Sequence, residues 1–274
     1  MSIRRFIFCK IVLTNMFVCV TLAASLSAFA IDCGDVITTS EVLDRNLVCN
    51  VSPALSVEGP SGSLNLDGFS VVCDGTSRGI SLDGVAAFLT GGDLMNGAVR
   101  DCGLGINAGE NGFHTIQGVI VSGSSSAGIA LRSEGNTLAL STVQTSDIGV
   151  YVFDPNNTII LNEMESNSVG VLLDAGDSLI SQNNVNNNTG WGVIIQRSDG
   201  STISQNSVIN NGGTDSASAG ILMDLFGQQG NFILGNTVTG NQNFDLLDLN
   251  INACDGSNVW VGNVFSISEP SCLD

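Results

Sequence analysis

The sequence predicts an all-β chain folded as a parallel β-helix, a solenoid of about ten coils. Three observations lead to this fold class. Short apolar triplets recur about every 21 residues, each triplet follows a glycine, and asparagine, serine and glycine fill the segments between them. A fixed period near 20 residues is typical of solenoids, in which each repeat packs only on its neighbours.

The first thirty residues have the layout of a secretory signal peptide. Three basic residues precede an apolar stretch that starts at Ile11, and Ala28 and Ala30 stand at the −3 and −1 positions of a cleavage site. A membrane anchor is the alternative, but the stretch is short for a span of about 20 residues. We expect cleavage after Ala30, which makes residues 31–274 a secreted chain, extracellular or periplasmic, with no membrane segment.

Removal of residues 1–30 makes the chain strongly acidic. Five arginines and 26 acidic residues remain, a net charge of −21 with the single histidine neutral. Such a chain repels nucleic acid and anionic lipid, so neither is an expected partner. A polyanion could bind only at a local arginine site or through a bound cation such as Ca²⁺. The sequence does not decide whether Ca²⁺ is a cofactor. The sequence does not determine the oligomeric state.

Six cysteines of the expected mature chain predict a disulfide framework. An even number of cysteines in an exported chain favours disulfides, and zinc is disfavoured because the chain has no C-x-x-C pair and only one histidine. Of the fifteen possible connectivities, we favour Cys33–Cys49, Cys73–Cys102 and Cys254–Cys272. The middle disulfide would join successive coils, and the other two would fasten the ends.

The regular coils are expected over residues 105–245. Five triplet-leading glycines lie 21, 21, 22 and 28 residues apart, and the longest interval contains an insertion, residues 212–219. The glycines are Gly128, Gly149, Gly170, Gly192 and Gly220. Two further short β segments per period, the second of the form Asn-x-Val/Met-x-x-Asn, predict one strand in each of three sheets, with asparagines stacked in ladders. A leucine-rich repeat is the alternative, but helix formers are scarce.

The two ends are expected to be less regular. Residues 31–104 contain similar strands at irregular spacing and form the N-terminal coils and cap, and residues 246–274 form the last coil and cap. Terminal repeats of solenoids are atypical because they close an open core. The chain from residue 31 onward thus resembles the right-handed parallel β-helix repeat proteins, the broad group that includes pectate lyases, polysaccharide C5-epimerases and NosD-like proteins. That resemblance implies a single-stranded right-handed parallel β-helix and leaves the activity open.

A candidate ligand surface follows from the alternation of side chains along a strand. The second residue of each triplet points outward, which makes an apolar column on the surface. Charged residues follow at the fourth and fifth positions after the glycines, where they form either a row of weak surface salt bridges or a sugar-binding edge. The expected substrate-binding residues are Tyr151, Leu172, Ile194, Leu222, Arg132, Asp174 and Asp224. A packed loop or tail over the column is the alternative.

The segment Tyr151-Val-Phe-Asp-Pro155 is similar to the Tyr-Gly-Phe-Asp-Pro-His motif of mannuronan C5-epimerases. This resemblance implies that Tyr151 is an acid/base group, Asp154 an active-site carboxylate and Arg197 the partner of the substrate carboxylate. The motif departs at its histidine, which is Asn156 here, and the family's lysine has no counterpart. His114 is the only histidine, and it is expected either to be structural or to replace the missing proton-transfer group.

The sequence therefore predicts a secreted β-helix protein that recognises or modifies a polysaccharide, with a uronate-polymer epimerase or lyase as the finer hypothesis. The rival class is a non-catalytic structural or adhesion protein of the cell surface. The two differ in whether Tyr151, Asp154 and Arg197 lie open on the surface or are covered.

Overall fold

The computed structural model describes residues 8–9, 19–20, 30–251 and 253–273. The chain divides into two units, Met1–Ala30 and Ile31–Asp274. Strands β1 (Phe8–Cys9) and β2 (Cys19–Val20) of the first unit pair antiparallel. The predicted signal peptide otherwise lies outside the described residues, and its cleavage stays a prediction.

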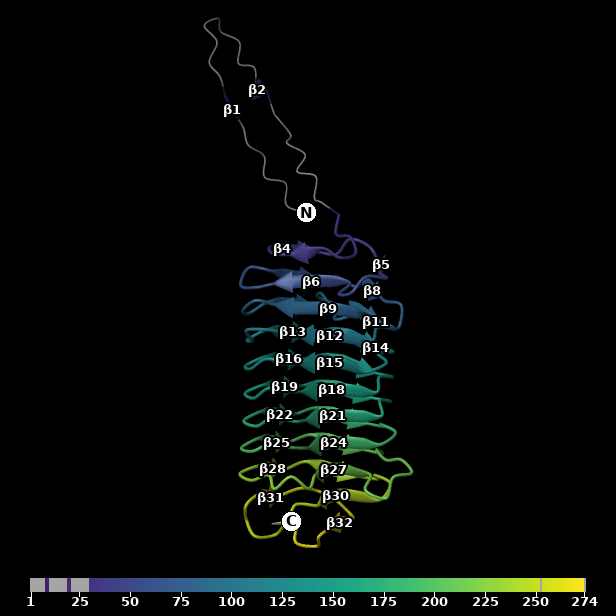
Figure 1. Ribbon diagram of the computed structural model, residues 1–274, viewed down its shortest axis with the longest axis vertical. Helices are drawn as coiled ribbons and strands as arrows, with labels where there is room; N and C mark the ends of the chain where they lie inside the picture. The colour runs from purple at the N-terminus through teal and green to yellow at the C-terminus, as the bar shows by residue number, and fades with distance from the viewer. Residues whose placement is uncertain (1–7, 10–18, 21–29, 252, 274) are drawn as a thin grey trace, which may run out of the picture. The chain divides into compact units, whose positions relative to one another are not determined.

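The second unit is a stack of coils in which each full coil contributes one strand to each of three parallel sheets (Figure 1). The 11-stranded sheet contains β3 (Val36–Ile37), β6 (Leu55–Glu58), β9 (Arg78–Asp83), β12 (Leu104–Ala108), β15 (Ala127–Leu131), β18 (Ile148–Val152), β21 (Val169–Leu173), β24 (Trp191–Ile195), β27 (Ala219–Met223), β30 (Phe244–Asp248) and β32 (Ser268–Glu269). Every neighbouring pair in this sheet is parallel, so the predicted β-helix is confirmed.

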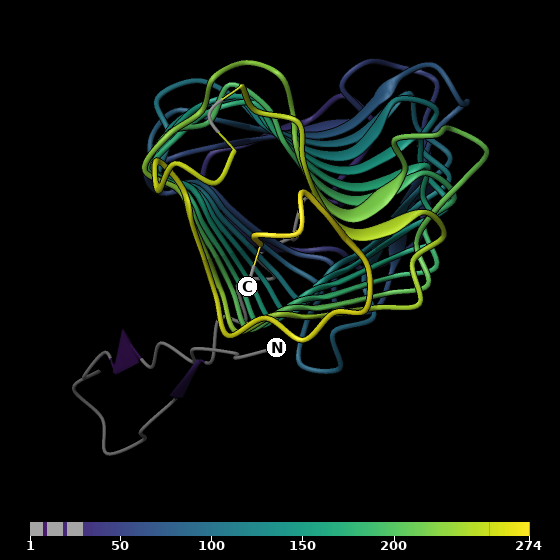
Figure 2. The ribbon, with the colours of Figure 1, turned by 90° about the horizontal axis from the view of Figure 1, so that it is seen from below.

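The other two sheets continue the same coils. The 10-stranded sheet contains β4 (Ser40–Val42), β7 (Ser63–Asn65), β10 (Phe88–Thr90), β13 (Thr115–Gln117), β16 (Thr137–Ala139), β19 (Thr158–Ile160), β22 (Leu179–Ser181), β25 (Thr202–Ser204), β28 (Phe232–Leu234) and β31 (Val259–Val261). The 9-stranded sheet contains β5 (Leu47–Val48), β8 (Ser70–Val72), β11 (Ala98–Arg100), β14 (Ile120–Ser122), β17 (Thr142–Gln144), β20 (Glu163–Glu165), β23 (Asn184–Asn186), β26 (Ser207–Ile209) and β29 (Thr237–Thr239). Seen from below, the coils lie almost on top of one another and enclose one interior (Figure 2).

The glycine before each apolar triplet is required by the close approach of consecutive coils. A Cβ atom at Gly149 would lie 2.5 Å from the carbonyl oxygen of Gly170 and 2.9 Å from Nδ2 of Asn167. Neither neighbour can withdraw, because one is backbone and the other is a buried ladder residue. This contact explains the repeated glycine in the sequence.

Side-chain ladders occupy all three corners between the sheets, as the sequence predicts. In each ladder a side chain accepts a hydrogen bond from the backbone N–H of its counterpart one coil earlier; Asn183 Oδ1, for example, accepts from the N–H of Asn162 at 2.9 Å. The first ladder is His114, Asn136, Asn157, Ser178, Ser201, Asn231 and Asn258. The second is Ser141, Asn162, Asn183, Asn206, Asn236 and Asn263. The third is Ser146, Asn167, Asn188, Asn211 and Asn241.

The three predicted disulfides are confirmed: Cys33–Cys49, Cys73–Cys102 and Cys254–Cys272. The middle one joins successive coils, and the other two lie in the first and last coils. At the C-terminal end, Trp260 and Leu273 join the interior apolar cluster, so the final segment closes the core. Across the described part of the chain, we find no helix with the length and apolar character that crossing a membrane requires.

Candidate functional site

The outer face of the 11-stranded sheet carries the predicted column. Ala130, Tyr151, Leu172, Ile194 and Leu222 are register partners on successive strands, from β15 to β27. Their neighbours in the chain, such as Val150 and Val152, are fully buried in the interior. The second residues of the triplets therefore face outward, as the alternation predicts.

Only the middle of this column is open. Tyr151, Leu172 and Ile194 are partly exposed, whereas Leu222 is 5% exposed and belongs to a second, exterior apolar cluster. That cluster includes Trp191 and also Ala217, which belongs to the loop before β27. The expectation that Leu222 is exposed in the column is thus corrected. A loop packs over this end of the column, which was the alternative interpretation of the sequence.

An aromatic pair extends the open part of the column. Phe153 follows Tyr151 by two residues on the same face, and their rings stack at 3.6 Å between centroids. The Arg132 guanidinium lies over the Phe153 ring at 4.0 Å, and that of Arg197 lies over Phe226 at 4.6 Å. Arginine stacked on an aromatic ring holds a flat cationic surface in place.

Asp174 contacts both Tyr151, one coil earlier, and Arg197, one coil later. The Tyr151 phenol donates to Asp174 Oδ2 at 3.3 Å, and Arg197 Nη1 donates to Asp174 Oδ1 at 3.2 Å. Burial, and then the adjacent Asp174 carboxylate, raise the pKa of the Tyr151 phenol. The phenol therefore keeps its proton at neutral pH and is available as a hydrogen-bond donor rather than as a base.

Two other predicted acidic residues are arranged differently. The Asp154 carboxylate forms no hydrogen bond or ion pair with any described residue; only its carbonyl oxygen accepts, from Asn157 Nδ2. Asp224 Oδ2 accepts from Gln196 Nε2 at 3.0 Å. The structure thus places Asp174 beside Tyr151 and Arg197, which is the position that the motif resemblance gave to Asp154.

His114 has a structural role. It is fully buried at the start of the first ladder, where Nδ1 accepts from the N–H of Ala87 at 3.1 Å and Nε2 lies 3.2 Å from the Glu110 carbonyl oxygen. Burial lowers the pKa of its imidazole. The hypothesis that His114 replaces the missing proton-transfer group is wrong, because the ring has no access to the outer face.

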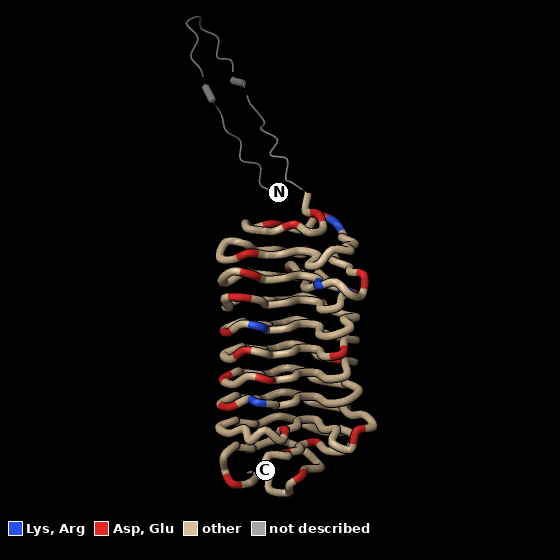
Figure 3. Tube along the Cα trace, viewed as in Figure 1, with Lys and Arg blue, Asp and Glu red and all other residues tan. Residues whose placement is uncertain are grey.

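Acidic residues recur along the edge where the strands of the 11-stranded sheet end (Figure 3), and Arg132 and Arg197 follow strands β15 and β24 at this edge. Among residues 30–251 and 253–273, no three His, Cys, Asp or Glu side chains form a group that could hold a metal ion. Each coil contributes only one or two carboxylates to this edge. The acidic residues of this edge are Glu58, Asp83, Glu110, Glu134, Asp154, Asp174, Asp177, Asp199 and Asp224.

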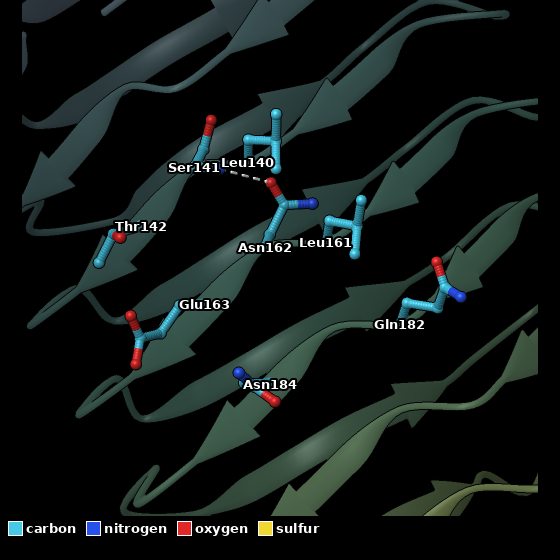
Figure 4. Close-up of a pocket in the computed structure, with 8 residues that line it drawn as sticks. All are labelled: Leu140, Ser141, Thr142, Leu161, Asn162, Glu163, Gln182 and Asn184. Carbon is cyan, nitrogen blue, oxygen red and sulfur yellow. Dashed lines mark hydrogen bonds between the residues drawn. The ribbon is translucent and has the colours of Figure 1, made fainter. Parts of the chain in front are cut away.

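A separate shallow groove of about 300 Å³ lies between the 10- and 9-stranded sheets (Figure 4). Leu140 and Leu161 are exposed at its rim, and Glu163 supplies its only charge. No aromatic ring lines it, and it has no cation. Its lining residues are Leu140, Ser141, Thr142, Leu161, Asn162, Glu163, Gln182 and Asn184. We regard the aromatic face around Tyr151 as the better candidate site, because it combines stacking surface with charged donors and acceptors.

Three aromatic residues of the site were missed by the sequence reasoning. Phe153 could have been found, since residues two apart in a strand share a face. Trp191 begins β24 and donates from Nε1 to the Ala217 carbonyl oxygen at 2.9 Å. Phe226 lies in the loop after β27, where the repeat has no fixed spacing and gives no signal.

Taken together, the three stacked parallel sheets and the corner ladders define a parallel β-helix. A sequence model of the family described as right-handed beta helix region matches residues 102–264, more than half of the chain. The chain belongs to this family. No protein with a curated description matches the sequence.

Solved structures with a similar fold have low sequence identity. They include the periplasmic alginate epimerase AlgG (13% identity, TM-score 0.49, covering 85% of this chain and 60% of that one) and the Dettilon tailspike protein (12%, 0.47, 84% and 60%). A third is the A-module of the mannuronan C-5 epimerase AlgE6 of Azotobacter vinelandii (13%, 0.38, 83% and 81%). The chain thus spans about 60% of the length of the first two, and the likeness concerns the fold.

Proposed function

We propose that the protein binds a polysaccharide chain along the outer face of the 11-stranded sheet, in an extracellular or periplasmic compartment. The observation that carries this proposal is the partly exposed row formed by Arg132, Phe153, Tyr151, Asp174 and Arg197 on four successive coils. Stacked aromatic rings offer flat apolar surface, and the charged groups beside them offer donors and acceptors for hydroxyl or carboxylate substituents.

Binding without chemistry fits this row better than catalysis. Removal of the proton at C5 of a uronate requires a base, and the Tyr151 phenol has a raised pKa and already donates to Asp174. The second proton-transfer group of the epimerase motif is absent, since Asn156 occupies its position and His114 is buried. The three disulfides agree with an oxidising compartment outside the cytoplasm.

An epimerase or lyase acting on a uronate polymer is the second candidate, favoured by the contact of Tyr151 with a carboxylate that is paired with arginine. Proton NMR of alginate and pectate after incubation with the protein, with and without Ca²⁺, separates the two candidates. New guluronate or unsaturated signals that vanish in Tyr151→Phe would establish the enzyme. Unchanged spectra with retained binding favour the binding protein.

The binding proposal is tested by affinity electrophoresis through neutral and acidic polysaccharides. Tyr151→Ala and Phe153→Ala should each weaken binding about tenfold, the equivalent of about 1.4 kcal/mol. The matched control is Leu161→Ala, which removes an exposed apolar side chain from the groove between the 10- and 9-stranded sheets. Equal mobility of all four proteins in every polysaccharide would refute the proposal.

A further inference from the structure

The loop before β27 differs from the turns that occupy the same corner in the neighbouring coils. Seven residues, 212–218, separate Asn211 from Ala219, whereas two residues separate Asn188 from Trp191 one coil earlier. The loop projects further from the stack than the earlier turns (Figure 1). We call residues 212–218 the insertion loop.

The insertion loop is fastened to the outer face of the sheet. Trp191 Nε1 donates to the Ala217 carbonyl oxygen at 2.9 Å, and Asn243 Nδ2 donates to the Asp215 carbonyl oxygen at 2.7 Å. Within the loop, Asp215 Oδ1 accepts from the N–H of Ala217 at 2.8 Å. The anchors come from the coils before and after the loop, so the loop has a fixed position.

Two outward-facing leucines are buried beside this loop. Leu222 and Leu247 are register partners that continue the column of Tyr151, Leu172 and Ile194, yet they are only 5% and 2% exposed. They form the exterior apolar cluster against which Trp191, Ala217 and Phe244 pack. The apolar column therefore continues for two more coils, but there the protein's own residues cover it.

We propose that the insertion loop sets the length of the bound polysaccharide by closing the C-terminal end of the binding face. This proposal rests on the proposed function. A sugar chain lying along the column then contacts the strands β15 to β24, a distance of about 14 Å at about 4.8 Å per coil. The ligand is a short oligosaccharide or the end of a longer chain, because an internal segment would have to run through the loop.

The test uses an oligosaccharide ladder of increasing length, made from a polysaccharide that binds the wild-type protein. In the first variant, Thr-Gly replaces residues 212–218, as in the preceding coil. Wild-type affinity should stop rising beyond a short length, whereas this variant should continue to gain, by about tenfold for the longest members. Short members should bind both proteins equally, since Tyr151 and Phe153 are unchanged.

A second variant covers the case in which the shortened chain does not fold. Trp191→Phe keeps the apolar packing and removes the hydrogen bond to Ala217, so it should show part of the gain for long members. If affinity depends on length identically in wild type and both variants, the role of the insertion loop is refuted while the binding function stands. If wild type binds no polysaccharide, both proposals are refuted.

Discussion

The phenol of Tyr151 and the carboxylate of Asp174 are joined from one coil to the next by a hydrogen bond of 3.3 Å. The carboxylate also accepts from Arg197, one coil further on, and its side chain is only 15% exposed. Tyr151 is therefore the first member of a chain of three groups that alternate donor, acceptor and donor along the rod. Such a chain has a spectroscopic consequence, because Tyr151 is the only tyrosine in the protein.

Ultraviolet titration of tyrosinate should report the Tyr151 pKa directly. We expect a value above the ordinary 10.0, because burial and the Asp174 charge both oppose ionisation. Asp174→Asn should lower this pKa relative to wild type, since it removes the carboxylate. Arg197→Gln should raise it further, since the guanidinium favours the phenolate. Shifts in the same direction in both variants would contradict the arrangement; circular dichroism over the titration shows that the fold is retained.

The lowered pKa of His114 should make the protein less stable on mild acidification. Below the ordinary histidine pKa of 6.5 the unfolded chain binds a proton, whereas the folded protein does not until its own, lower pKa is reached. The free energy of unfolding should therefore decrease as the pH falls from 6.5 towards the folded-state value. Urea unfolding at a series of pH values measures this slope.

His114→Asn is the matched control for that slope. Asparagine occupies the next position of the ladder, where Asn136 Oδ1 accepts from the His114 N–H at 2.9 Å. Its Oδ1 should replace imidazole Nδ1 as the acceptor for Ala87. The variant should fold and lose the pH dependence that sets in below 6.5. A slope that persists in the variant would mean that another group titrates there.

The repeating part of the molecule was predictable because every coil shares the same period and therefore the same order of inward and outward residues. The glycine marks the register, so the alternation from Gly149 correctly placed Tyr151 outward and beside Leu172. The disulfide Cys73–Cys102 followed from the stacking of successive coils, whereas the other two pairs were placed as fastenings of the ends. The sequence left open whether a loop covers the column, because such contacts lie outside the repeat. The burial of Leu222 depends on a loop outside the period.

The ladder residue Asn206 gives a stability test of the corners. Its Oδ1 accepts from the N–H and Nδ2 of Asn183, and its Nδ2 donates to Ile180 O and Asn236 Oδ1. Asn206→Ala should lower the free energy of unfolding by about 3 kcal/mol or more, because each buried group left without a partner costs about 1–3 kcal/mol.

Asn210→Gly is the control for Asn206→Ala. Asn210 is exposed in the next corner and has a φ of 57°, which glycine adopts without strain. Its replacement should change stability by less than about 0.5 kcal/mol. Urea unfolding with the disulfides intact measures both variants, and comparable losses would show that the ladder contributes no more than an exposed turn.

The disulfide Cys254–Cys272 should stabilise the last coils and leave the candidate site unaffected. It closes the segment that contains Trp260, and Leu273, which also packs in the core, directly follows Cys272. Coils of a solenoid contact only their neighbours, so the loss of one end is local. In the double variant Cys254→Ser and Cys272→Ser, amide exchange should accelerate in β30, β31 and β32. It should stay at the wild-type rate in β18 and β21, and the tyrosinate titration of Tyr151 should be unchanged. Faster exchange throughout the stack would instead mean that the coils unfold as one cooperative unit, whose stability depends on the disulfide at its C-terminal end.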